Sequence, residues 1–193
     1  MFSPGSRQNS RTASSVTTDS VTRLSVSELL QPNLVAAGTL VDLPLHSLLA
    51  QGIRALVLDV DRTLLPHRGS SLPEPMEAWL KRAQETVPLH LFSNNPSRAR
   101  IGGVAERLGV DFTTSAGKPR RSPLRRVLQQ LDLPAAQVAM VGDRVFTDVL
   151  AGNRLGMYTV LVKPIDATGQ PCRHDHWQRF EVKLAQLAGA ELS

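Results

Sequence analysis

The stretch "ALVLDVDRTLLP", Ala55–Pro66, decides the fold class because an apolar run leads directly into two aspartates one residue apart. The run Ala55–Leu58 is entirely apolar, which is typical of a strand buried on both faces of a parallel sheet. Side chains alternate along a strand, so Asp59 and Asp61 are expected to point the same way. Two like charges at the end of a buried strand indicate a site that binds something.

Apolar runs of this kind alternate with segments of helical periodicity along the chain. The runs lie at 55–58, 89–92, 138–141 and 158–162, and a shorter run at 111–115 is predicted to be an edge strand. Apolar residues at i, i+3, i+4 and i+7 from Met76, Ile101 and Leu124 predict three helices. Ser122 is predicted to cap the third, with Pro123 at its first position. Trp177, Phe180, Leu184 and Leu187 predict a closing helix. The alternation predicts an α/β fold, a three-layer, doubly wound parallel sheet.

Polar side chains follow the predicted strands at the point where each one ends. In order along the chain these are Asp59, Asp61 and Thr63, then Ser93, Asn94 and Asn95, then Lys118, and finally Asp143 and Asp148. Ligands of doubly wound sheets bind beyond the carboxyl ends of the strands. If the first and fourth runs form neighbouring strands, Asp143 joins the first aspartate pair.

The residue types at this edge indicate phosphoryl transfer. Crowded carboxylates repel one another, and a hard divalent cation with oxygen ligands, Mg²⁺ rather than Ca²⁺, relieves that repulsion. Lys118 and the hydroxyls of Thr63 and Ser93 suit phosphoryl oxygens. A carboxylate, a metal, a lysine and hydroxyls around one anion are the parts of a phosphoryl-transfer site.

The motifs "DVDRTLL", "LFSNN", "GKP" and "VGDRVFTD" resemble, in order, the four motifs of the haloacid dehalogenase (HAD) superfamily of phosphatases. Residues 28–166 resemble the YqeG-type subfamily, IIIA, through the lead-in to the first motif and the block around the fourth. Arg62 departs from the family pattern, in which asparagine or glycine is commoner at this position.

The resemblance implies roles for the polar residues. Asp59 is then the nucleophile that forms an aspartyl-phosphate, and Asp61 the general acid and base. Mg²⁺ is expected on the carboxylates of Asp59 and Asp143 and on the backbone carbonyl of Asp61. Asp148 is expected to orient a metal-bound water or Lys118, or only to favour a helix N-terminus. The transferring phosphoryl group is expected to contact Ser93 and Lys118, supported by Thr63 and Asn94.

The spacing of the motifs leaves no room for a cap domain, since each gap between them holds about one helix and one strand. A capless site is open and admits large or surface-bound phosphates. Relatives of the YqeG type include phosphatidylglycerophosphate phosphatases, which makes an anionic phospholipid the expected substrate. Two alternatives stay open: a phosphatase for a protein, nucleotide or other soluble phosphate, and a phosphate-binding regulatory module without turnover.

Composition favours anionic partners. The chain of 193 residues carries a formal net charge of +5, with a pI near 10.1. Nucleic acid is not the expected partner, because aromatic residues make up 4% of the chain. Peripheral membrane contact has two candidate segments: the basic cluster Arg120, Arg121, Arg125 and Arg126, which is otherwise a solvated helix face, and the apolar lead-in at 33–50.

Segments near the two ends of the chain give indications of where the protein lies in the cell. Residues 1–25 are rich in Ser, Thr and Arg and are expected to be a disordered tail, although a transit peptide has the same composition. Residues 26–193 are expected to form the phosphatase domain. A lone Cys172 favours a reducing compartment, and the expected location is cytoplasmic, with contact at a membrane surface and organelle targeting left open. Cys172, His174 and His176 are read as a polar loop rather than a metal site.

Overall fold

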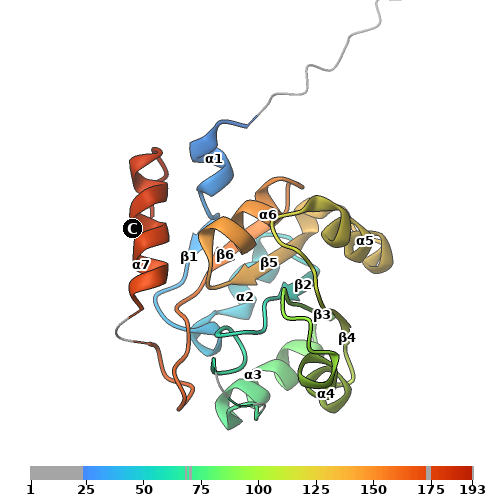
Figure 1. The fold of residues 1–193 in the computed structure, drawn as a ribbon. Coiled ribbons are helices and arrows are strands. Elements are labelled where there is room, and N and C mark those ends of the chain that lie inside the picture. The colour runs from blue at the N-terminus through green and yellow to red at the C-terminus, as the bar shows by residue number, and fades with distance from the viewer. Residues whose placement is uncertain (1–23, 68, 70, 173–174, 193) are drawn as a thin grey trace, which may run out of the picture.

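The computed structural model describes residues 24–67, 69, 71–172 and 175–192, so nearly all of the predicted tail lies outside the described residues, as does His174. Six parallel strands form one sheet in the order β1-β6-β5-β2-β3-β4 (Figure 1). The strands are β1 (Leu34–Val35), β2 (Ala55–Leu58), β3 (Leu89–Phe92), β4 (Asp111–Thr113), β5 (Val138–Gly142) and β6 (Tyr158–Leu161). The predicted parallel sheet is confirmed, and the predicted edge strand at 111–115 is β4, which lies at one edge.

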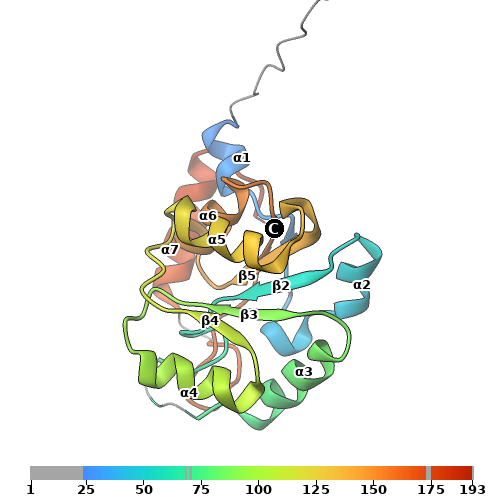
Figure 2. The ribbon, with the colours of Figure 1, turned by 90° about the vertical axis from the view of Figure 1, so that its right-hand side faces the viewer.

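Helices cover both faces of this sheet (Figure 2). They are α1 (Val26–Leu30), α2 (Leu45–Ala50), α3 (Glu74–Gln84), α4 (Arg98–Leu108), α5 (Arg121–Leu131), α6 (Leu150–Asn153) and α7 (His176–Leu187). On one face lie α2, α3 and α4, and on the other lie α5 and α6, with α1 and α7 beyond them over β6. This three-layer arrangement is the predicted one.

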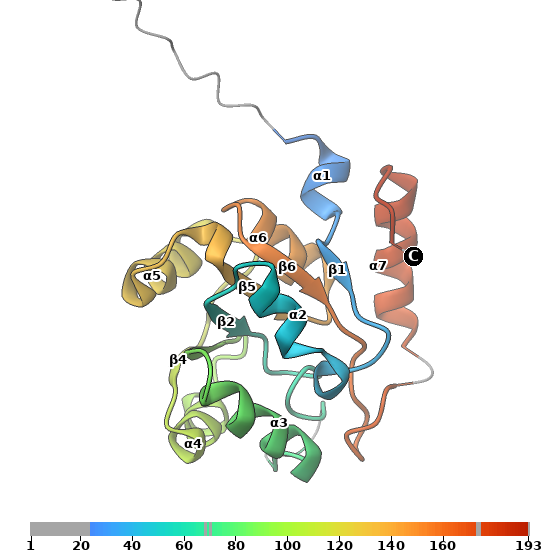
Figure 3. The same cartoon turned by 180° about the vertical axis from the view of Figure 1, so that it is seen from behind.

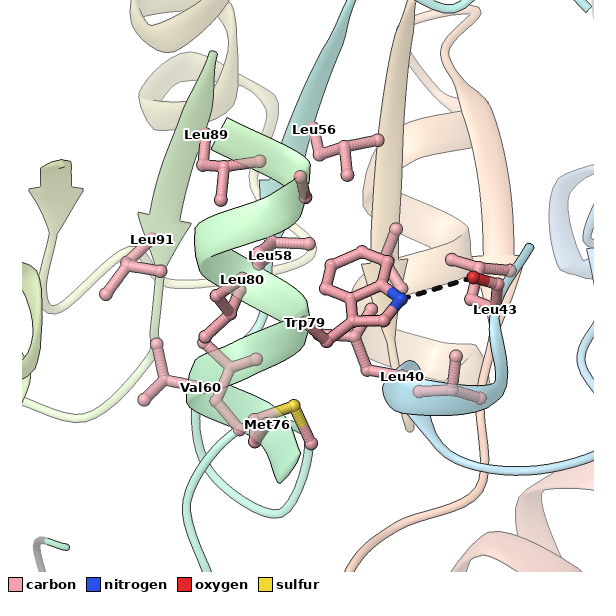
Figure 4. Packing of buried hydrophobic residues seen from close by; sticks show 14 of the residues in the cluster. Leu40, Leu43, Leu56, Leu58, Val60, Met76, Trp79, Leu80, Leu89 and Leu91 are labelled. Atoms are coloured by element: carbon pink, nitrogen blue, oxygen red, sulfur yellow. Dashed lines mark hydrogen bonds between the residues drawn. The ribbon is translucent and has the colours of Figure 1, made fainter. Parts of the chain in front are cut away.

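Strand β2 shows why its sequence is apolar at every position. Leu56 and Leu58 belong to the cluster formed with α3 and α4, whereas Ala55 and Val57 belong to the cluster formed with α5 and α6. Figure 4 shows the first cluster, in which the indole nitrogen of Trp79 donates a hydrogen bond to the carbonyl oxygen of Leu43. Both faces of the strand are buried, so no polar residue is tolerated before the site begins.

The start of α5 differs from the prediction. The helix begins at Arg121, with Arg120 as the N-cap residue and no side-chain capping bond, so the prediction of Ser122 as the cap is wrong. Pro123 therefore lies in the third helical position. Proline is tolerated there because the first four backbone N–H groups of a helix have no partner within it.

The lead-in at 33–50 is part of the core and not a membrane-facing segment. It forms β1, a 3₁₀ turn at Leu40–Asp42, and α2. Leu40, Leu43 and Leu48 are almost fully buried in the cluster with α3. The prediction that this segment lies on a bilayer is therefore wrong. None of the helices in the described part of the chain has the length and apolar character needed to cross a membrane.

The topology brings the predicted site together. Strand β2 pairs in parallel with both β5 and β3, so the residues that follow these three strands meet at one edge of the sheet. Among the described residues, α3 is the one helix between β2 and β3, and α4 the one helix between β3 and β4. The core therefore carries no cap domain at either of these places, as predicted.

Candidate active site

Asp59 lies at the centre of the site, directly after β2. Its backbone N–H donates to the carbonyl oxygen of Val141 in β5, which fixes its position beside the neighbouring strand. The carboxylate is ion-paired through Oδ1 with Nζ of Lys118, and Oδ2 accepts a hydrogen bond of 3.1 Å from the hydroxyl of Thr63. Lys118 Nζ also donates to the carbonyl oxygen of Phe92 at 3.1 Å. The structure thus places Asp59 against Lys118 and Thr63, the lysine and the threonine that the sequence predicted to bind the phosphoryl group.

Two further carboxylates surround Asp59. Carboxylate oxygens of Asp59, Asp143 and Asp148 lie within 4.8 Å of one another, and all three residues are buried. Asp148 belongs to a π-helical turn (η3, Val145–Val149), a rare geometry that is frequent at functional sites. Its Oδ1 lies 2.6 Å from Lys118 Nζ, so this carboxylate is placed to orient the lysine.

Gly142 makes room for this arrangement at the end of β5. A Cβ atom built at this position would lie 2.3 Å from the carboxylate of Asp148, far inside van der Waals contact. Any larger residue would have to displace Asp148. The glycine of the fourth motif is therefore needed for space beside the acidic group, and no strained backbone angle is involved.

Burial and crowding shift the protonation of the acidic group. Burial, opposed by Lys118 and reinforced by Asp148, raises the pKa of Asp59 to about 6. Burial also raises the pKa of Asp143 well above its ordinary value, and the neighbouring Asp59 and Asp148 raise it further. Burial alone would lower the pKa of Lys118, but the two carboxylates beside it outweigh burial and raise it. Lys118 is therefore a permanent cation. The raised pKa values of Asp59 and Asp143 show that the charged forms of these carboxyl groups are disfavoured.

The carboxylates of Asp59, Asp143 and Asp148 are suited to hold a divalent cation. Oδ2 of Asp143 is buried and has no hydrogen-bond partner among the described residues, as expected of an atom that serves a metal rather than a protein donor. The candidate ligand atoms are all carboxylate oxygens. Mg²⁺ prefers oxygen ligands. Within the described ranges, Asp59, Asp143 and Asp148 are the one group of three metal-ligating side chains that gathers closely enough to hold an ion.

Asp61 contacts the loop after β3. Ser93 Oγ donates to its Oδ2 at 3.0 Å, and Asn95 Nδ2 donates to its Oδ1 at 3.3 Å. Nε of Arg100, in the first turn of α4, donates to the same oxygen at 3.2 Å. Arg100 was not among the predicted site residues. In the sequence it is one of two arginines in the first turn of a helix, with Arg98, and nothing local distinguishes it from a solvated side chain.

Asn94 supports the loop that carries Lys118. Its Oδ1 accepts a hydrogen bond of 2.7 Å from the backbone N–H of Lys118, and its Nδ2 donates to the carbonyl oxygen of the same residue at 3.3 Å. The asparagine therefore positions the lysine backbone. The hydroxyl of Ser93 is fully buried in this structure and accepts a hydrogen bond from the backbone N–H of Asn95.

Helix α7 is fastened to the site loops by polar contacts that the sequence did not reveal. Asp175 caps the helix and forms an ion pair with Arg62 of the first motif. Gln178 Nε2 donates to the carbonyl oxygen of Asp143 at 2.7 Å. Glu181 is paired with Arg144 and also accepts from the backbone N–H of Val145. The closing helix therefore forms one wall of the site.

A cavity of about 400 Å³ opens at this edge of the sheet. It is lined by Asp59, Asp61, Arg62, His67, Ser93, Asn94, Lys118, Asp143, Arg144, Thr147 and Trp177. Thr63 and Asp148 do not line the cavity but contact residues that do. Thr63 donates a hydrogen bond to Asp59, and Asp148 is ion-paired with Lys118. The structure thus gathers the residues of all four motifs around one space, with the basic residues Arg62 and Arg144 on its wall.

Comparison with known proteins agrees with this geometry. A HAD-hydrolase-like family model matches residues 115–178. The probable phosphatase YqeG of Bacillus subtilis is 30% identical over 116 residues, which cover 60% of this chain and 67% of the relative.

The chain belongs to the HAD family of phosphatases.

Other relatives of this HAD phosphatase carry more specific names. A chloroplastic phosphatidylglycerophosphate phosphatase 1 of Chlamydomonas reinhardtii is 31% identical over 65% of this chain. The present chain covers 50% of the length of that relative. The mitochondrial phosphatidylglycerophosphatase GEP4 of Saccharomyces cerevisiae is 28% identical over 83% of this chain and 90% of the relative.

Solved structures show the same fold. A hypothetical protein of Xanthomonas campestris, XCC2798, superposes with a TM-score of 0.50 at 19% identity, over 69% of this HAD phosphatase and 75% of that chain. At this level of identity the similarity concerns the fold alone.

Replacement of Asp143 tests whether the three buried carboxylates bind a divalent cation. In EDTA, Asp143→Asn is expected to melt at the same temperature as the unchanged protein or higher, because it removes a buried group whose charged form is disfavoured. Mg²⁺ is expected to raise the melting temperature of the unchanged protein and to leave the variant unaffected. Thermal unfolding with and without Mg²⁺ measures both effects.

The matched control for this test is Asp111→Asn, because Asp111 is an exposed aspartate of β4. The control should retain the full response to Mg²⁺. An Asp143→Asn protein that still gains stability from Mg²⁺ would contradict the assignment of this residue as a ligand.

Proposed function

We propose that this HAD phosphatase removes the terminal phosphate of phosphatidylglycerophosphate to give phosphatidylglycerol, with Asp59 as a covalent nucleophile. The observation that carries the proposal is the convergence, in one cavity, of Asp59, Asp61, Lys118 and Asp143 from three strand ends. The names of the relatives from Chlamydomonas and Saccharomyces support the choice of substrate.

The first half-reaction transfers the phosphoryl group to the protein. A carboxylate oxygen of Asp59 attacks phosphorus, and the bond from phosphorus to the glycerol oxygen breaks. Asp61 gives its proton to the leaving oxygen, which departs as the alcohol. Asp59 then carries an acyl phosphate, and Asp61 is an anion beside Arg100.

The second half-reaction returns the protein to its starting state. Asp61 takes a proton from a water molecule as that water attacks phosphorus, and the bond from phosphorus to Asp59 breaks. The products are inorganic phosphate, the free carboxylate of Asp59 and a protonated Asp61. The net reaction consumes one phosphomonoester and one water and releases one alcohol and one phosphate.

Lys118 takes up negative charge of the phosphoryl group, and a divalent cation held by Asp59, Asp143 and the carbonyl of Asp61 would supply further neutralisation. Lys118 is held between Asp59 and Asp148 and is suited to neutralise a phosphoryl oxygen. The side chain of Asn94 holds the backbone of Lys118 in place. Ser93, whose hydroxyl donates to Asp61 in this structure, contributes a further hydroxyl donor for the phosphoryl group.

The wall of the cavity favours a substrate with more than one negative group. Arg62 and Arg144 line the same cavity as Asp59 and Asp143, and their side chains are 23% and 29% exposed. Phosphatidylglycerophosphate carries a phosphodiester near its terminal phosphate. The two arginines are suited to bind that second phosphate while the first one reacts.

A substrate panel tests the proposal. It contains phosphatidylglycerophosphate in detergent micelles, phosphopeptides, nucleotides and sugar phosphates, with Mg²⁺ throughout. We expect kcat/KM for the lipid to exceed that for each soluble phosphate by at least about tenfold, or about 1.4 kcal/mol of transition-state binding. Equal or faster turnover of a soluble nucleotide would overturn the proposed substrate while leaving the phosphatase assignment in place.

A further inference from the structure

Helix α7 packs with its largest apolar side chains outward, toward solvent. Its inner face presents the buried Glu181 and Ala185 to the rest of the protein. Trp177, Phe180 and Leu187 are 55%, 52% and 85% exposed. The sequence predicted the helix from these apolar residues, and the structure shows that they do not face the core. A helix with this orientation leaves its stronger apolar face available for another surface.

We define the outer stripe as Trp177, Phe180, Leu184 and Leu187, which are all exposed on α7. In the described part of the chain, the remaining exposed large apolar side chains are Leu24 and Val26, at the start of α1. Helix α1 lies beside the C-terminal end of α7, as Figure 1 shows and as the contact of Gln31 with Glu191 confirms. The exposed apolar residues are therefore gathered on two adjoining helices.

Charge distinguishes the kind of surface that fits the outer stripe. Arg179 and Lys183 are exposed beside it. Glu181, the single acid of α7, is buried and paired with Arg144. The solvent-exposed part of α7 thus combines aromatic and aliphatic side chains with positive charge alone, which is the pattern of helices that lie in the interface of anionic membranes.

The outer stripe is continuous with the mouth of the active site. Trp177 lines the cavity, and its ring lies under the guanidinium group of Arg144, 5.4 Å from ring centre to guanidinium carbon. The ring of Phe180 is 6.0 Å from that of Trp177. A surface that covers the stripe therefore also meets the entrance to the cavity.

We infer that the outer stripe of α7 inserts into the interface of an anionic lipid bilayer and holds the cavity entrance at the headgroups. The inference rests on the proposed lipid substrate, since a phosphatase whose substrate stays in the membrane gains from meeting it there. Trp177 is suited to the headgroup level, where tryptophan is enriched, and Phe180 belongs to the apolar face that such a helix buries. Arg179 and Lys183 then face the lipid phosphates.

A second copy of the chain fits the stripe less well. Spacings of three, four and three residues also describe a coiled-coil seam, but α7 has 12 residues, fewer than two heptads, and sustained coiled coils need three or four. Two copies packed through the stripe would bring Arg179 and Lys183 of each near like charges. A bilayer with anionic headgroups meets the same residues with opposite charge.

The experiment measures binding of the full chain to vesicles of phosphatidylcholine, with and without phosphatidylglycerol, by co-sedimentation. The test variants are Phe180→Ser with Leu187→Ser, and Arg179→Glu with Lys183→Glu. The matched control is Arg125→Glu with Arg126→Glu, an equal charge change on the exposed face of α5. Figures 1 and 3 place α5 on the opposite side of the molecule from α7. Turnover of a soluble aryl phosphate verifies that each variant is folded.

We expect the unchanged protein and the α5 control to bind the anionic vesicles, and both α7 variants to bind at least about tenfold more weakly with soluble turnover unchanged. Absence of vesicle binding by the unchanged protein, or loss of binding only in the α5 variant, would overturn the inference. So would a dimer in solution that Phe180→Ser with Leu187→Ser converts to a monomer. Vesicle binding without turnover of phosphatidylglycerophosphate in micelles would instead refute the proposed substrate alone.

Discussion

Asp59→Asn is expected to lower phosphatase turnover by at least about a thousandfold on every substrate, because the amide cannot attack phosphorus as the carboxylate does. The fold should survive. Asparagine has the same shape, and the change removes one of three crowded carboxylates while leaving Lys118 paired with Asp148. Steady-state kinetics and thermal unfolding of the same preparation measure the two effects.

Asp111→Asn is again the matched control, since it removes an aspartate charge from an exposed position on β4. It should retain full turnover. An Asp59→Asn protein that keeps more than about one tenth of the activity would show that Asp59 is not the nucleophile, and the acidic group would then have to act only through a metal.

Lys118→Met is expected to cost both activity and stability. The ammonium group lies between two buried carboxylates, Asp59 and Asp148. Removing one partner of a buried ion pair leaves uncompensated charge and typically costs about 3–5 kcal/mol of unfolding free energy. Turnover should fall at least about a hundredfold because the phosphoryl oxygens lose their cation. Denaturant unfolding and kinetics test the two parts, and saturating Mg²⁺ should recover part of the stability but not the turnover.

Lys81→Met provides the contrast for Lys118→Met. Lys81 pairs with Glu77 at 2.9 Å on the exposed side of α3, four residues apart. Pairs of this kind contribute about 0.3–0.5 kcal/mol. A similar small loss for Lys118→Met would contradict the buried network described for the active site.

The fold was largely predictable from the sequence because burial on both faces leaves a clear signature. The bounds predicted for β2 and β3 are those of the structure. Strand β1 was missed because two residues, Leu34 and Val35, are too few to form a recognisable run. Helix α7 was predicted correctly. Periodicity shows that its apolar residues share one face, but it does not show whether that face packs on the core or faces solvent. The outward orientation of Phe180 therefore had to come from the structure.

The candidate site was predictable where topology alone brings residues together. Asp59, Ser93 and Asp143 follow strands that are neighbours in the sheet, so their meeting follows from strand order. The partners that orient them were not predictable. Arg100 reaches Asp61 across 39 positions, and Arg62 reaches Asp175 across 113. Charged side chains in helices and loops look like solvated ones until the packing of the elements is known.

Trapping the phosphorylated protein tests the central claim most directly. The unchanged chain is mixed with Mg²⁺ and phosphatidylglycerophosphate labelled in its terminal phosphate, and turnover is stopped with acid within the first cycle. We predict a label on the protein that hydroxylamine removes, as expected for an acyl phosphate, and that maps to the peptide containing Asp59. Turnover without any trapped label, or a label on a peptide that lacks Asp59, would contradict the account.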